Sequence, residues 1–85
     1  MTRIIWTIQA IEDVEAIREF IARDSAWYAQ AEVERIVGAI ERLAVFPESG
    51  RIVPDLEETS MREVVQPPYR IVYRVLEREV LVLIV

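Results

Sequence analysis

Three arginines in the C-terminal part of the chain are the side chains whose type and spacing best suit chemistry. Arg62, Arg70 and Arg74 stand among alternating apolar residues, as residues of a half-buried strand do. A guanidinium group binds a phosphate or a carboxylate through paired, charge-assisted hydrogen bonds. We therefore expect the three side chains to form one positive patch on the exposed face of a sheet. Alternatively, they are solvated or paired with carboxylates, in which case they contribute little to stability.

The composition limits every other kind of chemistry. The chain has no histidine and no cysteine, and all ten of its basic residues are arginines. General acid–base catalysis would fall to carboxylates or tyrosines, and a transition metal would find only oxygen ligands. The acids Glu12, Asp13, Glu57 and Glu58 stand at a helix start and in a loop, where acids ordinarily adjust electrostatics. We assign them no chemistry, and we expect no cofactor and no bound metal.

Aromatic residues offer a second kind of candidate, a surface for a protein partner. Trp6 lies in an apolar segment, which predicts a core position. Trp27 and Tyr28 open a predicted helix, where at most one of them can face the preceding helix. We expect one of these two rings to lie on an exposed hinge.

Apolar spacing predicts a strand and two helices in the first half of the chain. Residues 3–8 are rich in β-branched and aromatic side chains, as a strand is. Glu12 and Asp13 then indicate a helix N-terminus, Asp24-Ser25 supplies capping side chains for a second helix, and Pro47 ends it. The two apolar stripes comprise Ile11, Val14, Ile17, Phe20 and Ile21, and then Ala29, Val33, Ile36, Val37, Ile40, Leu43 and Ala44. So short a break between the helices predicts a helical hairpin.

The second half of the chain predicts three further strands. A polar linker over residues 48–60 precedes a short strand over residues 61–65. Pro67-Pro68 forms a stiff connection to a strand over residues 70–76, and an apolar strand over residues 80–85 follows a tight polar link.

The alternation within the last two strands predicts which face is buried. Ile71, Tyr73 and Val75 share one face of their strand and are predicted to point inward. Residues 80–85 are apolar on both faces, which predicts a central strand covered from both sides. We therefore predict an α+β fold of order β-α-α-β-β-β, with a helical hairpin packed on one face of a small, mainly antiparallel sheet. Residues 1–85 are expected to form a single domain.

This element order and several local motifs resemble the RelE/ParE toxin superfamily of bacterial type II toxin–antitoxin systems. The motifs are Trp6-Thr7 before Ala10, Leu43-Ala44-Val45-Phe46-Pro47-Glu48-Ser49-Gly50-Arg51, Arg62-Glu63-Val64, and Tyr69-Arg70-Ile71-Val72-Tyr73-Arg74. The resemblance covers essentially the whole chain. It implies two helices against a curved antiparallel sheet, a small antitoxin that wraps and neutralises the toxin, and one of two activities. RelE-like members cleave messenger RNA on the ribosome, whereas ParE-like members poison DNA gyrase.

The residues favour the ParE-like activity. Arg70 falls on the position of a strand arginine that many of the ribonucleases use, which makes it the strongest single candidate and the catalytic one if the chain is a ribonuclease. However, Met61 and Glu63 stand where RelE has two lysines, and a carboxylate facing an RNA backbone repels it. We therefore expect a toxin of the plasmid-stabilisation type that binds DNA gyrase, with Arg62, Arg70 and Arg74 as target contacts and a cognate antitoxin as partner. The alternatives are a RelE-like ribosome-dependent endoribonuclease and a non-toxic remnant that still binds antitoxin.

Charge and chain ends complete these expectations. The formal charge of −5 opposes direct binding to nucleic acid. The absence of an apolar segment long enough for a signal or a membrane span predicts a cytoplasmic protein. Family members usually continue past the last apolar strand into a tail with His or Arg, and an ionised terminus resists burial directly after Val85. We therefore expect this chain to be a truncated or trimmed form that lacks the usual C-terminal tail.

Overall fold

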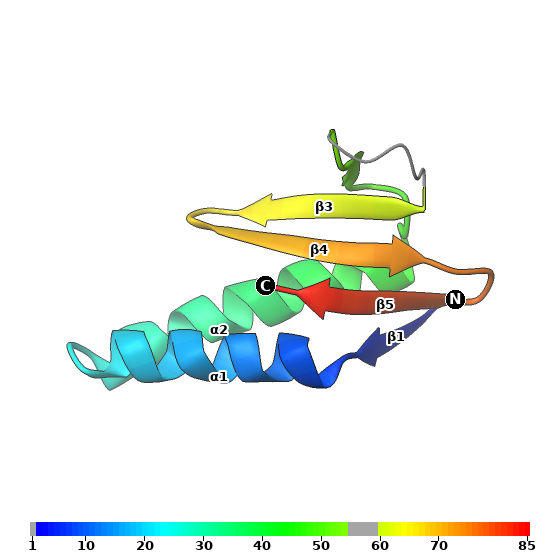
Figure 1. The fold of residues 1–85 in the computed structure, drawn as a ribbon. Helices are drawn as coiled ribbons and strands as arrows, with labels where there is room; N and C mark the ends of the chain where they lie inside the picture. Colours follow the sequence, from blue (N-terminus) through cyan, green and yellow to red (C-terminus); the bar gives the residue numbers. More distant parts are fainter. Residues whose placement is uncertain (1, 55–59) are drawn as a thin grey trace.

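A layer of two helices covers one face of a five-stranded sheet (Figure 1). The computed structural model describes residues 2–54 and 60–85. The elements in chain order are β1 (Arg3–Trp6), α1 (Ile8–Ala22), α2 (Ala26–Glu41), the 3-10 helix η1 (Arg42–Ala44), β2 (Arg51–Ile52), β3 (Met61–Gln66), β4 (Tyr69–Val75) and β5 (Glu79–Ile84). This arrangement confirms the predicted α+β class and the helical hairpin.

The sheet has the strand order β1-β5-β4-β3-β2. β1 runs parallel to β5, and every other neighbouring pair is antiparallel. The predicted order of elements is confirmed, with one addition: β2 lies inside the segment expected to be a linker. A strand of two residues is too short to show an alternation of apolar and polar side chains. β2 is therefore recognised only by its pairing with β3.

A side-chain hydroxyl caps the N-terminus of each of the two α-helices. The Thr7 side chain accepts a hydrogen bond from the Ala10 backbone N–H at 3.1 Å, so α1 begins about one turn before the position that Glu12 and Asp13 indicated. Thr7 Oγ1 also donates to the Val82 carbonyl at 2.7 Å, which ties the helix start to β5. The cap of α2 is Ser25, which accepts from the Tyr28 N–H, as predicted.

The apolar core lies between the helices and the inner face of the sheet. Ile71 and Tyr73 are fully buried there, which confirms the predicted inward side of β4. On α1 the predicted stripe was partly wrong: Ile11 and Phe20 are exposed, whereas the unpredicted Ala10 is fully buried. An apolar stripe can be wider than the strip of helix that the sheet touches, and its flanks then remain in solvent.

β5 lies between β1 and β4 in the sheet, and the two α-helices cover one of its two faces. Val80 and Val82 are fully buried beneath the helices, whereas Ile84 is exposed. The expectation of two covered faces was wrong because both α-helices of the described residues lie on the inner side of the sheet (Figure 1). A second, smaller apolar cluster forms on that face from Val53, Met61, Val72 and the partly buried Leu83.

Trp6 packs partly buried against the core, as predicted. Trp27 and Tyr28 are both exposed and contact each other edge to face, so neither ring packs under the first helix. The positions Glu57 and Glu58 lie outside the described residues. Within residues 2–54 and 60–85, no cluster of acids could hold a metal ion. Neither described helix has the length and apolar character that a membrane span requires.

Candidate functional site

The pairing of β3 with β4 separates the three candidate arginines. Residues directly opposite each other in an antiparallel pair point to the same face. Arg62 lies opposite Tyr73 and therefore points to the helix-covered side, whereas Arg70 lies opposite Val65 and Arg74 opposite Met61, on the outer side. The expected patch of three arginines is not formed. Alternation within each strand was visible in the sequence, but the offset between the two strands was not.

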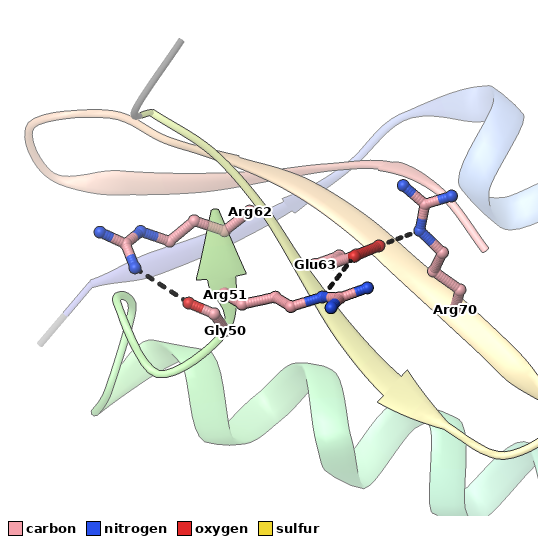
Figure 2. A network of polar contacts seen from close by, with 5 residues as sticks. All are labelled: Gly50, Arg51, Arg62, Glu63 and Arg70. Atoms are coloured by element: carbon pink, nitrogen blue, oxygen red, sulfur yellow. Dashed lines mark hydrogen bonds and ion pairs between the residues drawn. The ribbon is translucent and has the colours of Figure 1, made fainter. Parts of the chain in front are cut away.

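Arg62 holds the loop that enters β2. Its Nη1 donates to the carbonyl of Gly50 at 2.9 Å (Figure 2) and to the carbonyl of Glu48 at 3.1 Å. The hydroxyl of Tyr73 clamps the same loop from the core, because it accepts from the Gly50 N–H at 3.0 Å and donates to the Pro47 carbonyl at 2.9 Å. Burial raises the pKa of Tyr73, so this hydroxyl keeps its proton.

Gly50 fits this loop because it has no side chain. A Cβ at this position would lie 2.5 Å from the Glu63 carbonyl oxygen and 2.6 Å from the Tyr73 hydroxyl. The loop is thereby held against both β3 and β4, and the residue that follows it, Arg51, begins β2 opposite Glu63.

Glu63 joins two arginines on the outer face of the sheet. Glu63 is only 2% exposed, and each of its two carboxylate oxygens accepts a hydrogen bond from a different guanidinium group. The Nε of Arg51 donates to Oε1 at 2.7 Å, and the Nε of Arg70 donates to Oε2 (Figure 2). We call Arg51, Glu63 and Arg70 the arginine–glutamate triad.

The triad keeps Glu63 ionised. Burial raises the pKa of the Glu63 carboxyl, but the hydrogen bonds from Arg51 and Arg70 and the charges of both arginines outweigh this effect. The pKa of Glu63 is therefore lowered from its ordinary value. The sequence argument treated Glu63 as a carboxylate that would repel an RNA backbone; in the structure its charge is paired with those of two arginines.

Only part of this site was predictable from the sequence. Arg70 is a predicted site residue, whereas the sequence argument treats Glu63 only as an unfavourable charge and assigns Arg51, the last residue of one motif, no role in a site. One signal was available: Glu63 is the single acid of its strand, and an acid is seldom fully buried unless it is paired. The identity of the partners required the register.

The arrangement suits binding better than acid–base chemistry. Glu63 is the one described carboxylate that bonds to Arg70, and both of its oxygens are occupied by strong donors. The Tyr73 hydroxyl lies in the core on the opposite face, bonded to the loop. Arg74 lies on the outer face with its Nε 3.4 Å from the Met61 sulfur. Arg51, Arg70 and Arg74 therefore share the outer face, where the carboxylate bonded to Arg51 and Arg70 already accepts from both guanidinium groups.

Comparisons with known proteins agree with this fold. Residues 4–85 match the family described as the ParE toxin of the type II toxin–antitoxin system parDE. Toxin RelE2 of Caulobacter vibrioides is 41% identical over 76 residues, which are 88% of this chain and 82% of that protein. A solved structure titled as the chromosomal ParDE toxin–antitoxin system from P. aeruginosa is similar with a TM-score of 0.80. It is 24% identical, and the match covers 99% of this chain and 92% of that one.

The family match spans nearly the whole chain, and the described helices and sheet have the architecture that the local motifs implied. The resemblance seen in the sequence is confirmed at the level of the superfamily. The chain belongs to the ParE toxin family of type II toxin–antitoxin systems.

Proposed function

We propose that this toxin arrests growth by binding a protein target, and that the target is DNA gyrase. The observation that carries the proposal is that Arg70 is already bonded to the buried carboxylate of Glu63. In a ribonuclease this side chain would face the scissile phosphate with a general acid or base near it. Here its Nε donates to the buried Glu63 carboxylate, whose two oxygens each accept from a guanidinium group and whose lowered pKa makes it a poor proton acceptor.

The proposal also assigns a partner and a place. A toxin of a type II system is neutralised by a cognate antitoxin, and we propose that a small antitoxin protein binds this chain in the cytoplasm, where gyrase acts. Of the expected target contacts, Arg70 and Arg74 lie together on the outer face of the sheet. Arg62 is assigned to the loop that it holds.

A ribosome-dependent endoribonuclease is the second candidate function. The 41% identity to a protein named Toxin RelE2 favours it, because that name belongs to the RelE branch of the superfamily. In this reading Arg70 would contact the scissile phosphate and the exposed cations of the outer face would bind the RNA backbone. The complete absence of histidine and lysine from the chain counts against this candidate.

Two assays run side by side separate the candidates. Purified toxin is added to a gyrase supercoiling reaction and, in parallel, to ribosomes translating a defined messenger RNA. We expect loss of supercoiling, with the messenger intact, and we expect the cognate antitoxin to restore supercoiling. Cleavage of the messenger without any effect on gyrase would overturn the proposal in favour of the ribonuclease.

A pair of variants tests whether Arg70 contributes to the inhibition. Arg70→Gln should weaken the inhibition of gyrase, whereas Arg35→Gln should not. Arg35 is a matched control because it also pairs with a largely buried glutamate, Glu32 at 3.2 Å, but does so on α2 in the helix layer.

A further inference from the structure

One row of side chains crosses four strands on the outer face of the sheet. The register places Arg51 opposite Glu63, Glu63 opposite Val72, and Val72 opposite Ile84. Arg70 stands diagonally from Glu63, two residues before Val72, at a distance that a long side chain can span. The helices lie on the other side of the sheet, so this row faces away from the core (Figure 1).

The triad positions two guanidinium groups without using their full donor capacity. An arginine has five N–H donors, and Arg51 and Arg70 each give only the Nε donor to Glu63. Among residues 2–54 and 60–85, no acceptor takes the Nη donors of either side chain. The side chains of Arg51 and Arg70 remain 67% and 54% exposed. Each therefore presents the Nη1–Nη2 edge, which binds a carboxylate or phosphate through two parallel hydrogen bonds.

Glu63 makes these two groups better binding elements than free surface arginines. A solvated arginine loses side-chain entropy when it is immobilised by a ligand, and this loss weakens binding. The buried carboxylate holds both Nε atoms before any ligand arrives, so part of this ordering is already complete. Glu63 is thus a positioning residue and not itself a ligand contact.

Charge decides which anion the site would take. The triad carries two positive charges and one negative charge on a chain with a formal charge of −5. So small a local excess on an acidic protein gives little attraction for a polyanion, whose binding depends on many neutralised phosphates. A single carboxylate does not need such an excess. Exposed apolar side chains also stand on this face, Val65 directly opposite Arg70 and Ile84 at the end of the row, and they suit a protein segment better than a phosphate backbone.

We propose that Arg51 and Arg70, positioned by Glu63, bind carboxylate side chains in an acidic segment of the toxin's protein target, with Val65 and Ile84 against neighbouring apolar residues of that segment. The statement that this partner is the toxin's target rests on the proposed function. The carboxylate site itself does not rest on it.

The site can be tested without gyrase. The full chain is labelled with 15N in its arginine side chains and titrated with an acetylated, amidated Glu-Leu-Glu peptide, with Gln-Leu-Gln as the matched control and a short single-stranded RNA as a third probe. We expect saturable shifts of the Nε–H signals of Arg51 and Arg70 with Glu-Leu-Glu only, and none at Arg35. Absence of these shifts, or equal shifts at Arg35, would overturn the site. Stronger binding of the RNA would replace it with a nucleic-acid site.

Variants then test the role of each member. Arg51→Gln and Arg70→Gln should each lower the affinity for Glu-Leu-Glu roughly tenfold, which corresponds to the loss of one charge-assisted contact. Both replacements are at exposed side chains, so folding should survive. Glu63→Gln offers one acceptor in place of two, and its amide N–H₂ would face a guanidinium group. We expect it to lower the affinity while both arginines remain, with partial rescue by Glu63→Asp.

The same variants in the supercoiling assay connect the site with the target. If Arg51→Gln weakens both peptide binding and gyrase inhibition, the inference and the proposed function stand together. If peptide binding is lost while gyrase inhibition is unchanged, the placement of the target on this face is overturned and the proposed function survives. If the peptide binds as expected but gyrase is unaffected by the parent toxin, gyrase as the target fails and the carboxylate site remains.

Discussion

The two faces of the sheet bury their residues by different means. The inner face lies under α1 and α2, and its core of Ile71, Tyr73, Val80 and Val82 is fully removed from solvent. Neither α-helix of the described residues lies on the outer face, yet Glu63 is almost as deeply buried there. Two arginines are paired with it, and the stem of an arginine can shield a surface while its charged end stays in water.

The inner face therefore contributes mainly to stability, and the outer face is the one suited to recognition of a partner. Burial of apolar area on the inner face contributes most of the free energy of folding, because each large side chain adds about 1.5–3 kcal/mol. A half-exposed ion pair contributes little by comparison. Donors that the outer face does not use in folding remain available to a partner.

Truncation of Tyr73 should destabilise the protein most. Tyr73→Ala removes a fully buried aromatic side chain and both loop hydrogen bonds, and we expect a loss of about 3–5 kcal/mol in the free energy of unfolding. Tyr73→Phe keeps the ring and should cost about 1–3 kcal/mol, because the Gly50 N–H and the Pro47 carbonyl lose their partner. Urea unfolding followed by circular dichroism measures both. Equal stabilities of the two variants would show that the ring does not contribute to the core.

A methyl group at Gly50 should have an intermediate effect. The Cβ of Gly50→Ala would lie 2.5 Å from the backbone oxygen of Glu63, which belongs to a paired strand and cannot move alone. We expect a loss of about 1–3 kcal/mol, as for other insertions into a packed site. Gly38→Ala is the matched control, because its Cβ would meet only the Arg42 guanidinium, at 3.9 Å. Thermal melting of both variants checks this, and a neutral Gly50→Ala would mean that the loop does not depend on this close approach.

The dependence of stability on pH should show the smallest effect, and it belongs to the outer face. The pKa of Glu63 is lowered in the folded chain, so its contribution is present above the ordinary glutamate value and is lost as the pH falls through the lowered pKa. Arg51→Gln removes one of the two partners and should bring that pKa closer to the ordinary value. We therefore expect a smaller loss of stability in this variant than in the parent chain between neutral pH and about pH 3.

The control for this measurement is Arg35→Gln, whose glutamate partner lies on α2. Its melting temperature should fall with pH in parallel with that of the parent chain. Parallel curves for all three proteins would contradict the assignment of the titration to Glu63.

The inner face was largely predictable from the sequence. Period-two alternation over Ile71, Tyr73 and Val75 and helical spacing in the second stripe are properties of consecutive residues, and burial follows them directly. The predictions failed at the edges of these patterns. Ile11 and Phe20 extend an apolar stripe beyond what the sheet covers, and the short strand β2 has no pattern of its own.

The outer face was decided by the tertiary structure. Arg51 and Glu63 are 12 residues apart and meet only because β2 pairs with β3, while Arg70 reaches the same carboxylate through the register of β3 with β4. A shift of that register by one residue would reverse every face assignment, and nothing in the alternation of either strand defines the offset between them. Local patterns therefore determined which residues could be buried. The contacts between distant strands determined which charges share a site, because a charge interacts with whatever the fold brings within a few ångströms of it.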